Sequence, residues 1–336
     1  MKVAVLGLGF MGSTHLKALR SVPNATLAAI YSNDERARSG DLSAIQGNLG
    51  GPGEHFDFSA VRKYSNVDAL LADLSIEAVD ICLPTFLHSP VALAALRAGK
   101  HVLVEKPIAL DAASADQLVN ESRIANRVLM AAQVLRFFPM YQALRESLPK
   151  LGHTRHAMFR RRCAAPAWSK WLEDKSKSGG GVFDLLIHDI DMALWLFGEP
   201  SRVSAVGHED LPRGIDVINA QLLYGDGKTV TVTGGWHHPK SFPFSMEFTV
   251  VSDEGTIEYS SAGRPPTLYA KDGTETLLEL SGHDGYVEEI RYFVDCATAN
   301  RAPEKCPPES SAAAVKLALL LDEARKRNGE TIPCRL

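Results

Sequence analysis

The stretch that decides the fold is the N-terminal segment Lys2-Val3-Ala4-Val5-Leu6-Gly7-Leu8-Gly9-Phe10-Met11-Gly12. An apolar run of strand length leads directly into G-x-G-x-x-G, and a helical pattern follows over residues 13–21. In this context Gly7 permits a tight turn, Gly9 lets backbone approach a pyrophosphate, and Gly12 lets the helix pack on the sheet. The start of the helix adds free N–H groups and partial positive charge. The segment therefore predicts a dinucleotide-binding turn, with an ordinary glycine-rich turn as the alternative.

The rest of the first third repeats the strand-then-helix pattern. Short apolar runs at 26–31, 78–83, 101–104 and 128–133 predict further strands, with helical patterns between them. Nearly continuous apolar strands that alternate with helices indicate a parallel sheet covered on both faces. We therefore predict an NAD(P)-binding Rossmann domain over residues 1–134. A glycine-rich stretch at 40–60 interrupts the pattern and predicts a long surface loop of unknown role.

The second part of the chain follows a different pattern. Strand-like runs at 155–162, 203–208, 217–224, 229–236, 244–251 and 256–259 are separated by Gly and Asp turns, and helices are expected at 182–197 and 312–327. This pattern predicts a second domain over residues 135–336, with an open, mostly antiparallel sheet that has helices on one side. The fold class is thus α/β with a second α+β domain. A large sheet with one uncovered face needs a partner surface, so we expect a homodimer or homotetramer.

Composition excludes several classes of protein. The chain has 336 residues, and its 36 basic and 40 acidic side chains leave a net charge of −4, which argues against nucleic-acid binding. No apolar run approaches the roughly 18–20 residues of a membrane span, and the start lacks the pattern of a signal peptide. The five cysteines form no C-x-x-C pair, which argues against a zinc knuckle or disulfide framework. We expect a cytoplasmic protein without a metal site, a nucleic-acid partner or a membrane partner.

The end of the second predicted strand bears on the choice of cofactor. An acidic residue there suits the ribose of NAD, whereas a small residue with a nearby arginine suits the 2′-phosphate of NADP. Residues 31 and 32 are not acidic, and Ser32, Asn33 and Arg36 are the candidate cofactor contacts. Asp34 is an alternative ribose ligand, and Arg36 and Arg38 are alternatively a solvated helix face. The pattern slightly favours NADP over NAD.

Two segments carry candidate acid–base groups. Glu105-Lys106-Pro107 follows a predicted strand, and the carboxyl end of a parallel strand lies at the ligand crevice of an open α/β sheet. Asp184 and His188 follow three consecutive glycines and stand four residues apart, so they share a helix face. Histidine is suited to proton transfer near neutral pH. Taken alone, a lysine at a strand end is more often solvated than catalytic, and the Asp–His pair alone would be interpreted as a surface pair.

Further candidates lie on strand ends. Pro84, Thr85 and His88 follow another strand of the first domain, where a turn with a helix cap is the alternative. In the second domain the basic, aromatic stretch of 160–177 predicts contacts with an anionic or aryl-substituted sugar, against the alternative of a solvated strand edge. The candidate substrate contacts of this second group are Arg160, Arg162, Trp168 and Trp236.

Taken in order, these segments resemble the glucose–fructose oxidoreductase, inositol dehydrogenase and MocA (Gfo/Idh/MocA) family. The motifs that carry the resemblance are Gly7–Gly12 with His15, Pro84-Thr85 with His88, Glu105-Lys106-Pro107, Arg136-Phe137 with Pro139, and Asp184 with His188 and Asp191. The stretch Ile187–Met192 is most similar to the inositol dehydrogenases within that family.

The resemblance implies hydride transfer between a nicotinamide and a secondary alcohol of a sugar or cyclitol. It further implies that Lys106 and His188 share the acid–base work, that Asp184 supports His188 or the substrate, and that Gln133 and Arg136 line the pocket near the nicotinamide. The residues assigned to cofactor binding are then Gly7, Gly9, Phe10, Met11, Gly12, Ser32, Asn33, Arg36, Pro84, Thr85, His88, Glu105, Lys106 and Gln133.

Two other functions use nearly the same residues. A glycosidase with a non-consumed nicotinamide would oxidise a ring hydroxyl transiently and eliminate the aglycone. A non-catalytic NAD(P)-binding sensor is a third possibility, although it would not need Lys106, Asp184 and His188 together.

Overall fold

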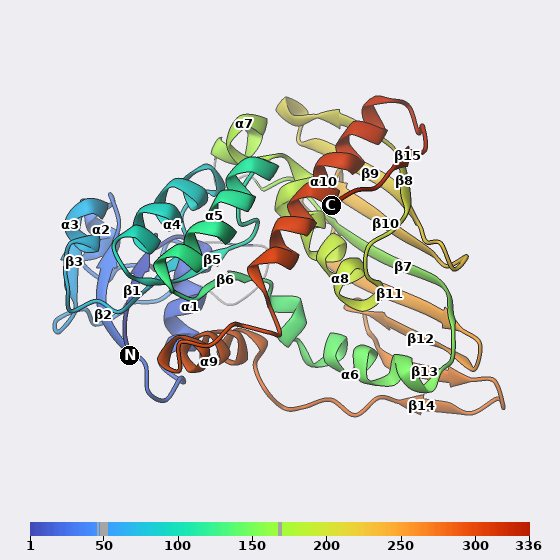
Figure 1. The fold of residues 1–336 in the computed structure, drawn as a ribbon, viewed down its shortest axis with the longest axis horizontal. Helices are drawn as coiled ribbons and strands as arrows, with labels where there is room; N and C mark the ends of the chain where they lie inside the picture. Colours follow the sequence, from blue (N-terminus) through green and yellow to red (C-terminus); the bar gives the residue numbers. More distant parts are fainter. Residues whose placement is uncertain (46, 48–52, 167–169) are drawn as a thin grey trace. The chain divides into compact units, whose positions relative to one another are not determined.

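The computed structural model describes residues 1–336 except 46, 48–52 and 167–169 (Figure 1). The chain forms two compact units, Met1–Val134 with His283–Ala312 and Leu135–Gly282 with Ala313–Leu336. The first segment of the first unit ends at residue 134, where the sequence analysis placed the domain boundary. The later segment His283–Ala312 also belongs to the first unit, although the sequence analysis assigned it to the second domain.

The first unit contains a parallel sheet of the Rossmann type, as predicted. Its strands lie in the order β3-β2-β1-β4-β5-β6, so the order reverses between β1 and β4, where open α/β sheets bind their ligands. The bounds are β1 Lys2–Leu6, β2 Thr26–Tyr31, β3 Arg62–Tyr64, β4 Ala78–Ile81, β5 His101–Glu105 and β6 Leu129–Ala132. The helices of this unit are α1 Phe10–Leu19, α2 Glu35–Arg38, α3 Val67–Leu71, α4 His88–Arg97, α5 Ala112–Ala125 and α9 Gly285–Thr298, with the short 3₁₀ turn η1 Thr85–Leu87.

The second unit is built on a mostly antiparallel sheet of nine strands, also as predicted, in the order β14-β13-β12-β11-β7-β10-β9-β8-β15. Only the central pair β7 and β10 runs parallel. The bounds are β7 Thr154–Cys163, β8 Arg202–Asp210, β9 Ile215–Leu223, β10 Thr229–Trp236, β11 Ser245–Ser252, β12 Gly255–Ser260, β13 Arg264–Ala270, β14 Glu275–Leu277 and β15 Ile332–Pro333. Its helical segments are η2 Val134–Phe137, α6 Pro139–Ser147, η3 Leu148–Lys150, η4 Lys170–Glu173, α7 Lys175–Ser178, the π turn η5 Val182–Leu186, α8 Ile187–Phe197 and η6 Leu211–Arg213, and α10 Pro308–Lys326 begins in the first unit and ends in the second.

Helix α8 covers one face of this sheet over β7 and β10 (Figure 1). Side chains alternate between the two faces along each strand, so Ala157, Phe159 and Arg161 are buried toward α8 while Met158, Arg160 and Arg162 are only partly buried. The same alternation along β9 leaves Asn219 exposed and Ile218 and Ala220 buried. One face of the sheet thus holds the core and the other remains accessible.

The elements that the sequence analysis missed include β13, β14 and α9. Strand β13 contains Pro265 and Pro266, which argue against a strand because proline cannot donate to a ladder. Strand β14 has three residues, all exposed, so its sequence has no apolar alternation. Helix α9 has an apolar face that packs on α1, and the sequence analysis assigned no element there.

The described part of the predicted loop at 40–60 is held together at its base. Asp41 forms an isolated antiparallel bridge with His55, and the N–H of Leu42 donates to the carbonyl of Glu54 at 3.1 Å. Residues 46 and 48–52 of this loop lie outside the described residues. Within the described ranges, none of the helices combines the length and apolar character that crossing a membrane requires.

Candidate functional site

The glycine turn after β1 has the shape that a bound phosphate group needs. Gly7 has a φ of +94°, and a Cβ there would lie 2.5 Å from the carbonyl oxygen of Cys82. A Cβ at Gly12 would lie 1.9 Å from the carbonyl oxygen of Gly7, whereas a Cβ at Gly9 would meet no atom of the described residues within 4 Å. Two glycines therefore build the turn, and within the described part of the chain Gly9 leaves an open approach to the start of α1. No described side chain caps that helix, so its first N–H groups can bind a pyrophosphate.

The carboxyl ends of β4, β5 and β6 bring further candidates to the same edge of this sheet. Pro84 and Thr85 follow β4, Lys106 follows β5, and Gln133 follows β6. Thr85 and Gln133 are buried, whereas Lys106 is half-buried. The amide oxygen of Gln133 has no hydrogen-bond partner within the described part of the chain. Together with the glycine turn, these residues fit a nicotinamide dinucleotide laid across the switch point.

His88 connects two backbone segments at this edge of the sheet. Its Nδ1 lies 2.8 Å from the carbonyl oxygen of Pro107, and its Nε2 lies 2.7 Å from the carbonyl oxygen of Leu83. The ring is 1 % exposed, and burial lowers its pKa. His88 therefore ties the segment after β4 to the segment that carries Lys106, a role that the sequence analysis did not assign to it.

The end of β2 carries the groups that would discriminate between cofactors. The Asp34 side chain caps α2 by accepting from the backbone N–H of Arg36, and Ser32 Oγ accepts from the N–H of Asp34. The guanidinium of Arg36 pairs with Asp41 at 2.6 Å, and this bond and charge lower the pKa of Asp41. Arg38 instead donates to the carbonyl oxygen of Ser32 at 2.5 Å. Of the two arginines, Arg38 therefore lies beside Ser32.

In the second unit, a glycine turn leads into the helix that carries the other acid–base candidates. Asp184 lies in the π turn η5 and His188 in the first turn of α8, and both are half-buried. Local π turns occur often at functional sites. Gly180 has a φ of +78°, and a Cβ there would lie 2.4 Å from Oδ2 of Asp216. The glycines thus allow the backbone of this turn to pack closely against β9, in addition to any room that they leave for a ligand.

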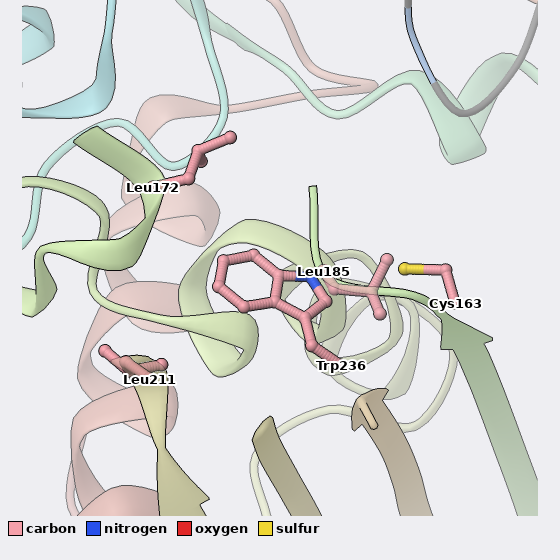
Figure 2. Packing of buried hydrophobic residues seen from close by; sticks show 5 residues of the cluster. All are labelled: Cys163, Leu172, Leu185, Leu211 and Trp236. Atoms are coloured by element: carbon pink, nitrogen blue, oxygen red, sulfur yellow. The ribbon is translucent and has the colours of Figure 1, made fainter. Parts of the chain in front are cut away.

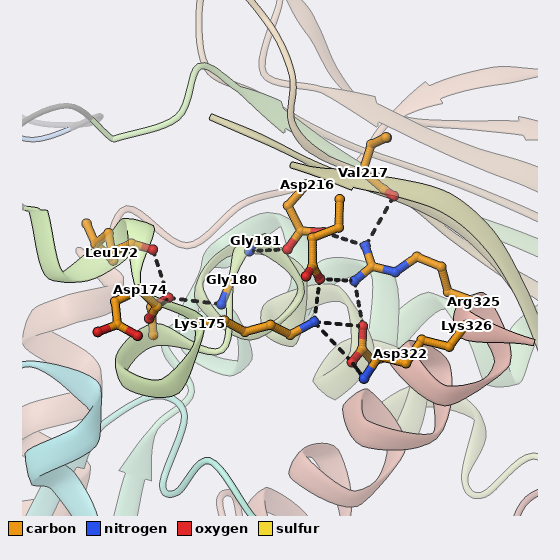
Figure 3. A network of polar contacts seen from close by, with 12 residues as sticks. Leu172, Asp174, Lys175, Gly180, Gly181, Asp216, Val217, Asp322, Arg325 and Lys326 are labelled. Atoms are coloured by element: carbon orange, nitrogen blue, oxygen red, sulfur yellow. Dashed lines mark hydrogen bonds and ion pairs between the residues drawn. The ribbon is translucent and has the colours of Figure 1, made fainter. Parts of the chain in front are cut away.

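A polar network holds this glycine turn (Figure 3). Oδ2 of Asp216 accepts from the N–H of Gly181 at 2.6 Å, and its Oδ1 pairs with Arg325 of α10. Arg325 also donates to Asp322 at 2.5 Å and to Glu209 at 2.6 Å. Burial raises the pKa of Asp216, and the charge of Arg325 opposes that rise. The network anchors the start of the His188 helix to the end of the chain.

Two buried ion pairs fix α8 itself. Arg136 donates from Nε and Nη2 to the carboxylate of Asp191, at 2.9 and 2.6 Å. Arg161 donates in the same two-pronged way to Asp189, at 2.8 and 3.0 Å. All four side chains are at least 97 % buried, and burial raises the pKa of both aspartates. Arg136 was predicted to line the substrate pocket, and its guanidinium is thus paired with the carboxylate of Asp191 in α8.

The remaining substrate candidates lie apart from α8 or in the core. Arg160 and Arg162 both pair with Glu247, on the sheet face opposite to Arg161. Trp236 is 2 % exposed and packs in a hydrophobic cluster that is shown in Figure 2 and is made up of Cys163, Leu172, Leu185, Leu211 and Trp236. Its indole Nε1 has no hydrogen-bond partner among the described residues. Trp168 lies outside the described residues.

Comparison with known proteins identifies the family. A model described as an oxidoreductase family with an NAD-binding Rossmann fold (GFO/IDH/MocA) matches residues 1–133, and the model of the GFO/IDH/MocA C-terminal domain matches residues 141–258. UDP-N-acetylglucosamine 3-dehydrogenase of Acidithiobacillus ferrooxidans is 31 % identical over 90 % of this chain and 90 % of its own length. The chain belongs to the Gfo/Idh/MocA oxidoreductase family.

Other members are similar over nearly the whole length. The scyllo-inositol 2-dehydrogenase (NADP⁺) IolU of Bacillus subtilis is 24 % identical over 99 % of this chain and 98 % of its own. The structure of a levoglucosan dehydrogenase in complex with NADH and levoglucosan superimposes with a TM-score of 0.85, at 19 % identity, over 100 % of both chains. At that identity the structural likeness establishes the fold alone.

Membership in the Gfo/Idh/MocA family makes this protein a nicotinamide-dependent dehydrogenase. The first unit gathers the glycine turn, Thr85, Lys106 and Gln133 at one sheet edge, and the second unit gathers Asp184 and His188 on one helix. The sequence analysis missed the residues that hold these groups in place. His15 was noted as part of a motif without a role, and nothing in the sequence pairs Asp216 with Arg325 across 109 residues.

Proposed function

We propose that the protein transfers a hydride between a nicotinamide cofactor and a secondary alcohol of a sugar, sugar derivative or cyclitol. The observation that carries the proposal is the edge of the first sheet, where the open approach at Gly9 follows β1 and the half-buried Lys106 follows β5, with β4 between these two strands. The substrates in the names of the relatives support the class, since they are a UDP-sugar, an inositol and levoglucosan.

In this proposal Lys106 and His188 hold and move the proton of the reacting hydroxyl. Lysine and histidine are suited to that work because both titrate near the range in which an enzyme operates once their surroundings are adjusted. Asp184 supports His188 or binds a substrate hydroxyl. The nicotinamide ring, when bound, supplies the hydride acceptor or donor.

We further propose a slight preference for NADP. The support is local: no acidic side chain ends β2, Asp34 is occupied as a helix cap, and the guanidinium of Arg38 lies at the backbone of Ser32. A 2′-phosphate at Ser32 would meet that positive charge, as in other NADP sites. Both cofactors occur among the relatives, because IolU is named for NADP⁺ and the levoglucosan dehydrogenase structure contains NADH.

We also propose a cytoplasmic homodimer or homotetramer. All five cysteines are free thiols, which suits a reducing compartment. The accessible face of the sheet along β7, β10 and β9 has the extent that a second copy would cover. Light scattering on the eluting protein tests the assembly, and a monomer at micromolar concentration would contradict it.

The deciding experiment incubates the purified protein with a panel of sugars, uronates, cyclitols and aryl glycosides. Reduced-nicotinamide absorbance is followed with NAD⁺ and NADP⁺ separately, and free aglycone is measured in the same wells. We expect absorbance growth, and a loss of about 10²–10⁴ in kcat for Lys106→Met and His188→Asn. The exposed residues Lys63 and His208 offer matched controls, Lys63→Met and His208→Asn, which should retain activity.

Two other outcomes of the same panel would change the assignment. Aglycone release without net reduction of the cofactor would support the redox-assisted glycosidase and refute net dehydrogenation. Selective loss of uronate oxidation in Arg160→Ala or Arg162→Ala would support an anionic substrate. An unchanged ratio of uronate to neutral-sugar oxidation in both variants would refute it.

A further inference from the structure

A buried polar cluster lies in the first unit immediately before Lys106. His15 of α1 is completely buried, and its Nδ1 lies 2.9 and 3.0 Å from the two carboxylate oxygens of Asp80 in β4. Its Nε2 lies 3.1 Å from Oε1 of Glu105, the last residue of β5. One imidazole ring thus bridges two buried carboxylates from neighbouring strands.

This geometry defines the protonation of the ring. Nδ1 is hydrogen-bonded to Asp80, and Nε2, which has no hydrogen-bond partner among the described residues, lies at ion-pair distance from Glu105, so both edges of the ring face a carboxylate. Burial is the largest single influence and lowers the pKa of His15, but the charge of Asp80 and the hydrogen bonds to Asp80 and Cys82 together outweigh it and raise that pKa well above its ordinary value. Burial would likewise raise the pKa of Glu105, and the hydrogen bond and charge of His15 hold it below its ordinary value. The array is therefore carboxylate, imidazolium, carboxylate.

The array is connected to Lys106 through Glu105. Oε2 of Glu105 accepts from the backbone N–H of Lys106 at 3.1 Å, so the carboxylate holds the backbone nitrogen of Lys106 in place. The positive charge of Lys106 also lowers the pKa of Glu105, which means that the two side chains interact electrostatically. The carboxylate of Glu105 therefore holds the backbone of Lys106 and interacts with its side chain.

The other titratable groups that face the array do not replace His15. Burial raises the pKa of the Cys82 thiol, whose sulfur lies 3.4 Å from Nδ1 of His15. Burial and the charge of Glu105 raise the pKa of Tyr286, whose ring centroid lies 6.4 Å from that of His15. Both groups are thus neutral near pH 7. The charge of His88 acts on Glu105 as well, but its ring nitrogens are directed at backbone carbonyls.

We propose that His15 is a positioning residue for Lys106: its imidazolium keeps Glu105 ionised and fixed, and Glu105 in turn holds the backbone that carries the Lys106 amine. The inference rests on the proposed function only for the use made of Lys106. It deepens that function by adding a group that touches neither substrate nor cofactor.

A metal ion is the competing explanation for this cluster. The ligand atoms of His15, Asp80 and Cys82 lie within 4.8 Å of one another. Two ligands at about 2.0–2.2 Å from a tetrahedral zinc ion would, however, be separated by about 3.4 Å. The 2.9 Å between Nδ1 and Asp80 is instead the distance of a direct charge-assisted hydrogen bond.

The first test needs no enzymatic activity. Nitrogen-15 NMR of histidine-labelled protein at pH 8 should show one doubly protonated ring that disappears in His15→Gln. A His15 ring in the neutral form at pH 8 would overturn the proposal. So would one equivalent of zinc per chain that is lost on chelation together with the His15 signal.

The second test measures the reaction rate of the Lys106 amine with an acylating reagent at pH 7, by peptide mass spectrometry on the cofactor-free protein. Without the imidazolium, two buried carboxylates face each other and Glu105 takes up a proton. His15→Gln and Glu105→Gln should then each accelerate Lys106 labelling by about three- to tenfold, because the carboxylate that holds the Lys106 backbone and attracts its ammonium group is no longer ionised. The double variant should match the faster single variant, because both changes remove the same charge.

Controls separate this effect from general damage. Asp80→Asn removes a charge that raises the pKa of His15, so Lys106 labelling should accelerate in the same direction as in His15→Gln. Exposed Lys63 should label at the same rate in every variant. An unchanged Lys106 rate in Glu105→Gln or in Asp80→Asn, or multiplied effects in the double variant, would each overturn the proposal.

The pH profile of kcat/KM then links the cluster to the reaction. Lys106→Met should abolish one limb of this pH profile. His15→Gln and Glu105→Gln should shift the same limb along the pH axis, while the KM for the cofactor stays nearly unchanged. If the wild-type protein oxidises no substrate of the panel, the proposed function fails while the labelling results stand. If labelling fails in an active enzyme, only the role of His15 is lost. If His15→Gln does not fold, the NMR spectrum of the wild-type protein and the Lys106 labelling rate of Glu105→Gln still test the proposal.

Discussion

Replacing Arg161 by methionine should destabilise the second unit far more than the same change at its neighbour Arg160. Both arginines lie on β7, and they point to opposite faces of the sheet. Arg161 is 2 % exposed and donates twice to the buried Asp189, with further contacts to Tyr141 at 3.4 Å and the sulfur of Met246 at 3.5 Å.

The expected magnitudes follow from burial. Arg161→Met leaves a buried carboxylate without a countercharge, which costs about 3–5 kcal/mol in free energy of unfolding. That is about a hundred- to several-thousand-fold in the folding equilibrium of the second unit. The side chain of Arg160 is 38 % exposed, and its partner Glu247 retains Arg162. Arg160→Met should therefore cost about 0–1 kcal/mol.

Urea titration followed by tryptophan fluorescence measures the difference, because all four tryptophans lie within residues 135–282 of the second unit. Adding Asp189→Leu to Arg161→Met removes the stranded charge and should recover most of the loss. Equal midpoints for the two single variants would refute the reasoning, as would a double variant no better than Arg161→Met.

The sign of the pH dependence provides a second check on the same pair. Burial already raises the pKa of Asp189, and losing Arg161 raises it further. An acid with a raised pKa in the folded state contributes stability below its unfolded pKa and loses it as pH rises through the folded value. The loss in free energy of unfolding caused by Arg161→Met should therefore be smaller near pH 5 than near pH 8. A deficit that grows on acidification would contradict a stranded carboxylate.

Three further predictions concern the cofactor turn and the glycine network. Gly9→Ala should weaken dinucleotide binding at unchanged thermal stability, whereas Gly12→Ala should lower the melting temperature because its Cβ would meet backbone at 1.9 Å; calorimetric binding and melting scans distinguish the two. Arg38→Met should raise the KM for NADP⁺ by about tenfold and change that for NAD⁺ by less than twofold, and equal changes in steady-state kinetics would contradict its role at the 2′-phosphate. Arg325→Met leaves Asp216 buried without its countercharge, so the second unit should lose about 3–5 kcal/mol in urea titration, and a loss below 1 kcal/mol would refute the network.

The sequence predicted best those features that depend on neighbours along the chain. The turn Gly7–Gly12 combines a strand, three glycines and a helix within a short window, and the structure assigns each glycine a distinct constraint. The period-two alternation of a strand over 155–162 likewise explains why Arg161 is buried while Arg160 and Arg162 are only partly buried. Both inferences use local geometry, in which side-chain direction follows directly from the backbone.

Features that depend on distant partners could not be predicted in this way. The apolar positions Ile290, Phe293, Val294 and Ala297 have helical spacing, but nothing local shows that α9 packs on α1 near the other end of the chain. Likewise, the sequence shows three adjacent arginines without showing which carboxylates they meet. Pairing across tens of residues decides which of them is a structural ion pair and which remains partly accessible.

These distant pairs determine how the candidate acid–base residue His188 is presented. Successive residues of an α-helix are rotated by about 100°, so Asp189 and Asp191 lie on either side of His188 around the axis of α8. Each aspartate is held by a two-pronged arginine, Asp189 by Arg161 of β7 and Asp191 by Arg136 of η2. Any rotation of α8 that moved His188 would stretch both pairs at once, and a stretched pair in the buried interior has no water to replace its bonds. The direction of the imidazole is therefore fixed by two ion pairs that contribute no atom to the proposed chemistry.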